Sequence, residues 1–187
     1  MWKRLKSREK IYSIAAIVII IDQIVKLIIR TKMTLNSTIE LIPKVFNLTY
    51  VENTGAAFSI LKDSTIILVI IGLLFLFSID YYIKKEKSFT KLSIISLGII
   101  IGGIVGNLID RLLLHAVVDY FDFVLINFPI FNIADTCITI GVVLFIISTI
   151  IDEVKDNKKK EIKIEEEPVK KKITSKKKKV TKKKEEK

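Results

Sequence analysis

The polar residues of this chain gather in one stretch, and their types suggest acid–base chemistry. Between Gly102 and Thr136 an otherwise apolar sequence contains several glycines and asparagines, one arginine and four aspartates. Two carboxylates a few ångströms apart cannot easily both ionise, so one stays protonated to polarise a scissile carbonyl while the other takes a proton from water. Asp119 and Asp135 are the candidates for such a pair. The sequence offers no serine, cysteine or histidine constellation for nucleophilic catalysis.

Asp135 also has a purely structural interpretation. Asn132, followed three residues later by Asp135, is close to a capping box, in which the asparagine begins a helix and the acidic residue favours the positive end of the helix dipole. Asp122 is a second acidic residue near Asp119. The residues alone leave open whether Asp135 caps a helix or takes part in catalysis.

Two series of residues repeat at every fourth position of the apolar segment 92–113. The first series consists of glycines: Gly98, Gly102 and Gly106. Small residues at this spacing let helices approach closely without a hydrophobic driving force. The second series is more polar and lies on a neighbouring face: Gly103, Asn107 and Arg111. Arg111, beside Asp110, is either an anchor at the membrane interface or a group that holds a carboxylate or the backbone of a nearby loop.

A third polar feature interrupts the first apolar segment. Asp22 and Lys26 are four residues apart and therefore lie on one face of a helix, where they can neutralise each other. Ionisable groups within a bilayer are costly and mark either function or a structural ion pair. The pair therefore either braces the packing of helices or contacts a substrate directly.

Composition places these residues in an integral membrane protein. Half of the 187 residues are hydrophobic, and the mean hydropathy is +0.44. We predict an all-α membrane fold with four transmembrane helices, of which the first is a retained span rather than a cleaved signal. The expected spans are 11–29, 65–83, 92–113 and 134–151. The fourth is short for a full crossing unless residues 132–135 already begin the helix.

The segments between the spans carry a weaker pattern. Residues 45–51 alternate between apolar and polar side chains, which is typical of a half-buried strand, and the turn-forming residues 52–55 follow. We therefore expect a small extracytoplasmic β-element within residues 30–63. Residues 114–134 are expected to form a second outer loop, whose aromatic side chains suit a membrane interface.

Charge predicts the orientation and a separate tail. Lysine and arginine crowd the N-terminus, the loop 84–91 and the C-terminal segment, so the positive-inside rule places both termini in the cytoplasm and the aspartates near the extracytoplasmic surface. Residues 1–154 form the predicted four-span domain, and residues 155–187 a lysine-rich tail expected to be disordered. The tail either lies on anionic lipid or binds nucleic acid or the ribosome. Because the chain has one cysteine and one histidine, we expect no metal site.

Five motifs in order resemble those of the bacterial lipoprotein signal peptidases, the signal peptidase II family. They are DQIVK at 22–26, FNLTYVENTGAAFS at 46–59, GGIVGNLIDR at 102–111, VVDYFDF at 117–123 and FNIADT at 131–136. The resemblance implies a four-span intramembrane aspartic peptidase, without metal or cofactor, that cleaves prolipoproteins before a cysteine carrying diacylglyceryl. Asp119 and Asp135 match the catalytic aspartates, and the resemblance favours Asp119 over Asp122 because Asp119 follows the paired valines.

The resemblance also implies roles for the other polar residues. Positions associated with substrate binding or with support of the site are Asn53, Gly55, Gly103, Asn107, Arg111 and Asn132. One of the three asparagines would stabilise the oxyanion. Asp22 matches a position that supports the fold, with Lys26 as its structural partner. The implied enzyme is a monomer of the bacterial cytoplasmic (inner) membrane that acts on prolipoproteins and has no nucleic-acid partner.

Two other classes of function remain open from the residues alone. A small transporter or channel would place Asp22, Lys26, Asn107 and Arg111 along a pathway, although the short chain lacks the paired repeats typical of transporters. A membrane scaffold would act through the basic tail, which is longer than the family resemblance implies. Deletion of residues 157–187 separates the scaffold from the peptidase, because the peptidase keeps its activity.

Overall fold

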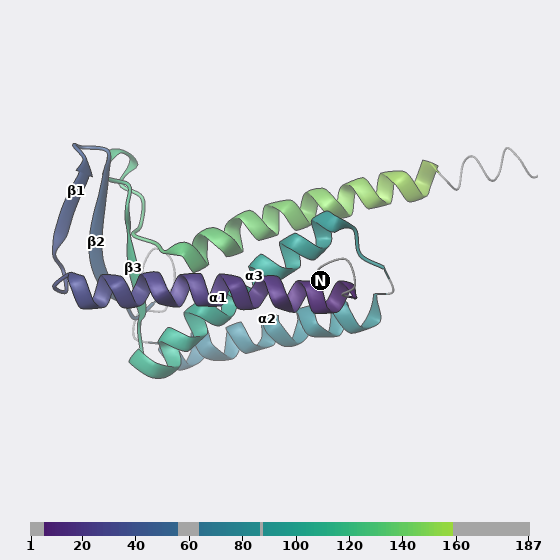
Figure 1. Ribbon diagram of the computed structural model, residues 1–187, viewed down its shortest axis with the longest axis horizontal. Helices are drawn as coiled ribbons and strands as arrows, with labels where there is room; N and C mark the ends of the chain where they lie inside the picture. Colours follow the sequence, from purple (N-terminus) through teal and green to yellow (C-terminus); the bar gives the residue numbers. More distant parts are fainter. Residues whose placement is uncertain (1–5, 56–63, 87, 159–187) are drawn as a thin grey trace, which may run out of the picture. The chain divides into compact units, whose positions relative to one another are not determined.

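The computed structural model describes residues 6–55, 64–86 and 88–158. Its described part contains four helices that are long and apolar enough to cross a membrane: α1 (Ser7–Lys32), α2 (Thr65–Lys85), α3 (Lys91–Leu114) and a last helix, Ile133–Lys158 (Figure 1). The strands β1 (Thr38–Ile42), β2 (Phe46–Asn53) and β3 (Val117–Asp122) form one antiparallel sheet, followed by the short 3-10 helix η3 (Val124–Ile126). The predicted fold class is confirmed.

The chain divides into two compact units, of which the first ends at Ile146 and the second begins at Ile147. All the site residues described below belong to the first unit. In the second unit, the described residues continue the last helix to Lys158. Most of the predicted disordered tail, residues 159–187, and residues 56–59 of the second motif lie outside the described residues.

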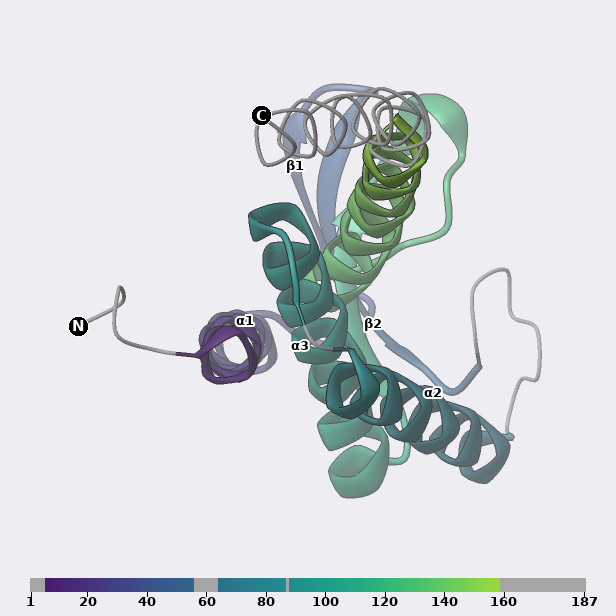
Figure 2. The ribbon, with the colours of Figure 1, turned by 90° about the vertical axis from the view of Figure 1, so that its right-hand side faces the viewer.

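Helix α3 is the central helix of the first unit, with most of its apolar segment buried (Figure 2). Its glycine series faces α1, because a Cβ atom added at Gly102 would lie 2.6 Å from Cβ of Val18. Gly103 faces the last helix, where an added Cβ would lie 2.5 Å from the carbonyl oxygen of Ala134. Small residues therefore allow two helices to pack closely on adjacent faces of α3, and the sequence spacing predicts this for the first glycine series.

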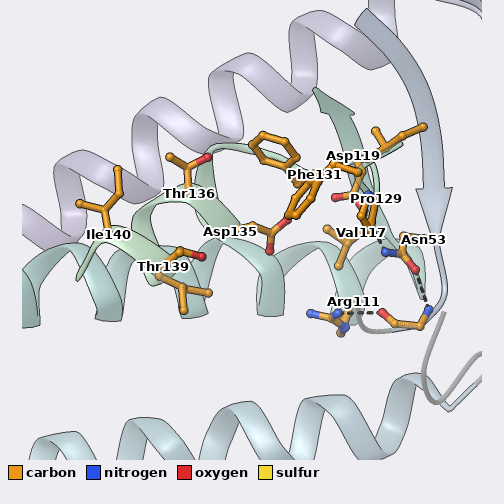
Figure 3. Close-up of a pocket in the computed structure, with 14 residues that line it drawn as sticks. Asn53, Arg111, Val117, Asp119, Pro129, Phe131, Asp135, Thr136, Thr139 and Ile140 are labelled. Atoms are coloured by element: carbon orange, nitrogen blue, oxygen red, sulfur yellow. Dashed lines mark hydrogen bonds between the residues drawn. The ribbon is translucent and has the colours of Figure 1, made fainter. Parts of the chain in front are cut away.

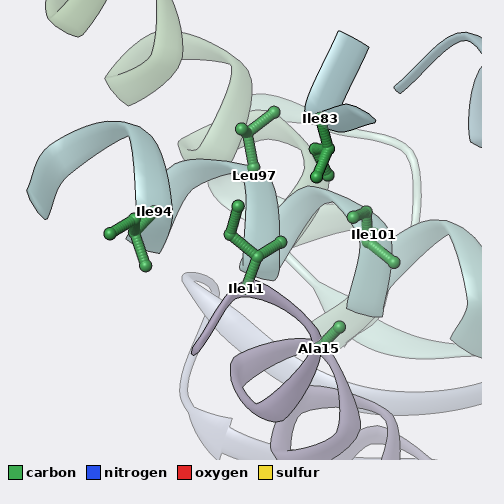
Figure 4. Packing of buried hydrophobic residues seen from close by; sticks show 6 residues of the cluster. All are labelled: Ile11, Ala15, Ile83, Ile94, Leu97 and Ile101. Carbon is green, nitrogen blue, oxygen red and sulfur yellow. The ribbon is translucent and has the colours of Figure 1, made fainter. Parts of the chain in front are cut away.

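A second contact region of α3 is purely apolar. Side chains of α1, α2 and α3 meet in one cluster: Ile11, Ala15, Ile83, Ile94, Leu97 and Ile101 (Figure 4). Ile11 and Ile83 are fully buried, although most large apolar side chains of α2 are exposed on the protein surface. Exposed apolar helix faces are expected where lipid rather than water surrounds the protein.

The sheet joins two segments that are distant in the sequence. Strand β2 pairs with both β1 and β3, and the register places Val51 opposite Asp119 and Asn53 opposite Val117. Asp119 therefore lies on a strand, and the prediction of a loop across residues 114–134 was wrong for β3. The first four residues of β3 are all buried, so this strand has no polar face and lacks the alternation by which a half-buried strand is identified.

The last helix begins at Ile133, so residues of the fifth motif open it. Helix α3 ends at Leu114, where His115 adopts a left-handed conformation with φ of 59°. Strand β3 starts two residues later. These two helix ends bring Asp119 and Asp135 to the same end of α3.

Candidate active site

The two predicted aspartates are joined by one asparagine. Asn132 Nδ2 donates to Asp119 Oδ1 at 2.7 Å, and the backbone N–H of Asn132 donates to Asp135 Oδ2 at 3.2 Å. Asn132 is fully buried and Asp119 is 2% exposed. In Figure 3 Asp119 extends from β3 and Asp135 from the first turn of the last helix. The structure therefore brings together residues that are 16 positions apart in the sequence.

Asp135 also caps the helix that carries it. The N–H of Asp135 donates to Asn132 Oδ1 at 2.9 Å, while Asp135 Oδ2 accepts from the backbone of Asn132. These reciprocal bonds are the capping box that the sequence suggests. The two interpretations of Asp135 are compatible, because Asp135 Oδ1 accepts from outside the box, from Asn107 Nδ2 at 2.7 Å.

The remaining N–H groups of the first turn have partners on other elements. Ala134 N donates to Asp22 Oδ1 of α1 at 3.1 Å, and Ile133 N donates to the hydroxyl oxygen of Tyr120 of β3 at 3.3 Å. Burial raises the pKa of Tyr120 above its ordinary value, so the phenol stays neutral. The start of the last helix, and with it Asp135, is thus attached to both α1 and β3.

Each aspartate accepts one hydrogen bond on each oxygen from a described residue. Asp119 Oδ2 accepts from Asn53 Nδ2 at 2.9 Å, which completes its pair of donors. The side chain of Asn53 is itself fixed by a local turn, because its Oδ1 accepts from Gly55 N at 2.9 Å. Such donors favour the ionised form of a carboxyl group.

Burial opposes ionisation of Asp119. Removal from water, together with the negative charge of Asp135, raises the pKa of Asp119 to about 7, despite the hydrogen bonds from Asn53 and Asn132. With a pKa of about 7, Asp119 keeps its proton in slightly acidic solution. A carboxyl group of this kind can act as a general acid near neutral pH.

A cavity of about 440 Å³ opens beside the pair. Its polar lining residues include Asn53, Arg111, Asp119 and Asp135. Most of the other wall is apolar and includes Val117, Phe128, Pro129, Phe131, Ile138 and Ile140. Arg111 also donates to the carbonyl oxygen of Gly55 at 3.1 Å, so it holds the backbone that follows β2. The cavity suits an apolar ligand with a polar group placed at the aspartates.

Lys26 and Asp22 form a buried ionic cluster outside this cavity. Lys26 Nζ lies 2.9 Å from Asp22 Oδ2 and 2.9 Å from Asp110 Oδ2, and it donates to Asn107 Oδ1 at 2.9 Å. Asp22 is fully buried and Lys26 is 2% exposed. This placement agrees with the bracing interpretation, because neither side chain lines the cavity.

Gln23 and Asp110 belong to this cluster and were not among the predicted site residues. Gln23 Nε2 donates to Asp110 Oδ1 at 2.9 Å and to the carbonyl oxygen of Gly106 at 3.1 Å. Asp110 Oδ2 also accepts from Val118 N at 3.1 Å. The sequence does contain an indication for Asp110, since it extends the glycine series by one more step of four residues.

Within the described part of the chain, no group of three or more histidine, cysteine, aspartate or glutamate side chains is arranged to hold a metal ion. The donor set around the aspartates consists of amide N–H groups, which bind anions rather than cations.

Comparison with known proteins agrees with this arrangement. The family model for signal peptidase (SPase) II matches residues 14–151. The lipoprotein signal peptidase of Symbiobacterium thermophilum is 40% identical over 144 residues, covering 76% of this chain and 95% of that protein. The enzyme of the same name from Halothermothrix orenii is 43% identical over 138 residues, covering 73% of this chain and 92% of that protein.

The solved structures agree as well. The structure of a bacterial membrane enzyme superimposes with a TM-score of 0.70 at 38% identity, covering 75% of this chain and 87% of that one. These comparisons do not favour a transporter or channel. The chain belongs to the signal peptidase II family, and it is a multi-pass membrane protein and an aspartic peptidase.

Proposed function

We propose that this protein removes signal peptides from diacylglyceryl-modified prolipoproteins, with Asp119 and Asp135 as its catalytic pair. The observation that carries the proposal is the pair of buried carboxyl groups that Asn132 joins at the wall of an apolar cavity. The relatives named lipoprotein signal peptidase support the substrate class. An aspartate pair needs no metal and no covalent intermediate, since water attacks the peptide bond directly.

In the proposed reaction the ionised carboxylate takes a proton from water, and the resulting hydroxide adds to the scissile carbonyl carbon. The protonated carboxyl group donates its proton to the carbonyl oxygen. In the collapse, the carboxyl group that took the proton of water gives it to the amine nitrogen, which leaves, and the other carboxylate takes back a hydroxyl proton as the new carboxyl group of the product forms. Asn53 and Arg111 line the cavity and are the proposed donors to the substrate backbone. Asn132 is the weaker candidate for this role, because its Nδ2 already faces three acceptors.

The apolar wall explains why a lipid-modified chain would be preferred. Side chains such as Phe128 and Ile140 exclude water from the pair and offer contact to hydrocarbon. The positive-inside distribution of lysine and arginine supports cytoplasmic termini and an extracytoplasmic position of the sheet and the cavity in the proposed inner-membrane enzyme. The site would then meet signal peptides after their export.

The substrate class is tested with two versions of one prolipoprotein, one carrying diacylglyceryl on its cysteine and one unmodified. The purified protein in lipid nanodiscs is expected to cleave the first at least about 100-fold faster, since two acyl chains supply binding energy that the bare cysteine lacks. Mass spectrometry of the products locates the cut on the N-terminal side of the cysteine. Equal rates for both versions, or a cut elsewhere, would contradict the proposal.

The pH dependence tests the shared proton. Because the pKa of Asp119 lies at about 7, the pair loses its remaining proton as the pH rises through that value, and kcat/KM is expected to fall about tenfold per pH unit above it. At low pH both carboxyl groups are protonated and the general base is lost, so the profile is bell-shaped. A rate that stays constant from pH 6 to pH 9 would show that no group of this kind titrates in the free enzyme.

A further inference from the structure

We propose that Lys26 is a positioning residue for the aspartate pair, because its ammonium group fixes the orientation of the Asn107 side-chain amide. This inference depends on the proposed function, since it concerns the same pair. Lys26 does not line the cavity and is 2% exposed, so it cannot contact a substrate. Of its three partners, Asn107 is the one whose side chain itself donates to an aspartate of the pair, and Lys26 Nζ donates to Asn107 Oδ1 at 2.9 Å.

The argument begins with the donor capacity of Lys26. An ammonium group has three N–H donors and no acceptor. Lys26 Nζ has three acceptors at 2.9 Å, namely Asp22 Oδ2, Asp110 Oδ2 and Asn107 Oδ1. Because the ammonium group can only donate, the atom of Asn107 that faces it must be the carbonyl oxygen. The amide nitrogen of Asn107 then faces Asp135, to which it donates at 2.7 Å.

A second donor acts on the same oxygen. Asn132 Nδ2 donates to Asn107 Oδ1 at 3.1 Å. The orientation of Asn132 is also fixed, since its Oδ1 accepts from the N–H of Asp135. If the Asn107 amide turned over, its NH2 group would face two donors and its oxygen would face the carboxylate of Asp135. Lys26, Asn107 and Asn132 thus form one directed series of hydrogen bonds in which Asp135 can only accept.

Removal of Lys26 takes away the stronger of the two constraints on Asn107. The Asn107 amide can then turn over whenever Asp135 is protonated, because Asp135 can donate its proton to Asn107 Oδ1. This new hydrogen bond stabilises the protonated form of the pair. The remaining charges act in the same direction, because Asp22 and Asp110 lose their shared cation. Arg111, at the cavity wall, keeps a positive charge beside the pair. Without Lys26 the pair should therefore ionise at higher pH.

The variant is Lys26→Met, and Gln23→Leu is its matched control. Gln23 bonds to the same two carboxylates and to the backbone of α3, but it makes no hydrogen bond to Asn107. Each variant is assayed in nanodiscs on the lipid-modified prolipoprotein, for kcat, KM and the pH profile, with thermal unfolding measured in parallel. Lys26→Met is expected to lower kcat about tenfold to 100-fold, with little change in KM, and to move the acid limb of the profile to higher pH. Gln23→Leu is expected to unfold at a lower temperature and to keep the wild-type profile.

A buried carboxylate left without its cation can prevent folding. The double variant Lys26→Met with Asp22→Asn removes one cation and one anion, so the net charge of the cluster is unchanged, and it is expected to show the same shift of the acid limb. A folded variant without Lys26 that keeps the wild-type profile would overturn the inference, as would the same shift in Gln23→Leu. Failure of the wild-type protein to cleave the substrate would instead count against the proposed function.

Discussion

Asp119→Asn and Asp135→Asn are each expected to reduce cleavage of the lipid-modified prolipoprotein by at least about 10³-fold, because each removes a group that must give or take a proton. An asparagine side chain has nearly the same shape as aspartate, so the helix start and the sheet should be retained. The activity of the double variant should lie within a small factor of that of the less active single variant, since the two groups act as one unit. The measurement is a single-turnover assay with mass spectrometry of the product.

Asp122→Asn is the matched control for this experiment. Asp122 lies at the end of the same strand as Asp119, but its Oδ2 accepts from Thr49 Oγ1 at 2.7 Å and it does not line the cavity. Its replacement should leave kcat/KM within about twofold of the wild type, because no proton transfer passes through it. Loss of activity in Asp122→Asn together with full activity in Asp119→Asn would mean that the wrong aspartate of β3 has been assigned.

Asn132→Ala is expected to have the second-largest effect, because one side chain holds both aspartates. The variant loses the donor to Asp119 Oδ1 and the acceptor for the N–H of Asp135. Loss of the cap should cost about 1 kcal/mol in the free energy of unfolding. The activity should fall about 10²-fold or more, because the two carboxyl groups are no longer held in one geometry. Thermal unfolding and kcat are measured on the same preparation.

Asn132→Ser separates the two roles of this residue. Serine is a good N-cap and can accept from the N–H of Asp135, but its short side chain cannot reach Asp119. We expect Asn132→Ser to recover most of the stability that Asn132→Ala loses while its activity stays low. If Asn132→Ser were as active as the wild type, the hydrogen bond from Asn132 to Asp119 would have no part in catalysis.

The sequence by itself determined the membrane class and the candidate residues. Four apolar segments of sufficient length predict four spans, since a bilayer admits few other structures. The four-residue spacing of Gly98, Gly102 and Gly106 predicted close packing of α3, and the structure confirms it against α1. The spacing of Asn132 and Asp135 predicted a capping box, and its bonds are present. These features depend on neighbours along one helix, so a local pattern is enough to identify them.

Only the tertiary structure decided which polar groups meet. Strand β3 was not identified from its pattern, because burial of Val117, Val118, Asp119 and Tyr120 removes the alternation that a strand with one polar face would show. The hydrogen bonds from Asn53 to Asp119 and from Asn107 to Asp135 span 66 and 28 residues of sequence. No local spacing encodes such contacts, because they depend on the register of the sheet and on the close approach of helices at glycine. The sequence thus provided the two aspartates, and the packing of α1, α3 and the sheet gave them their donors, their burial and their shared cavity.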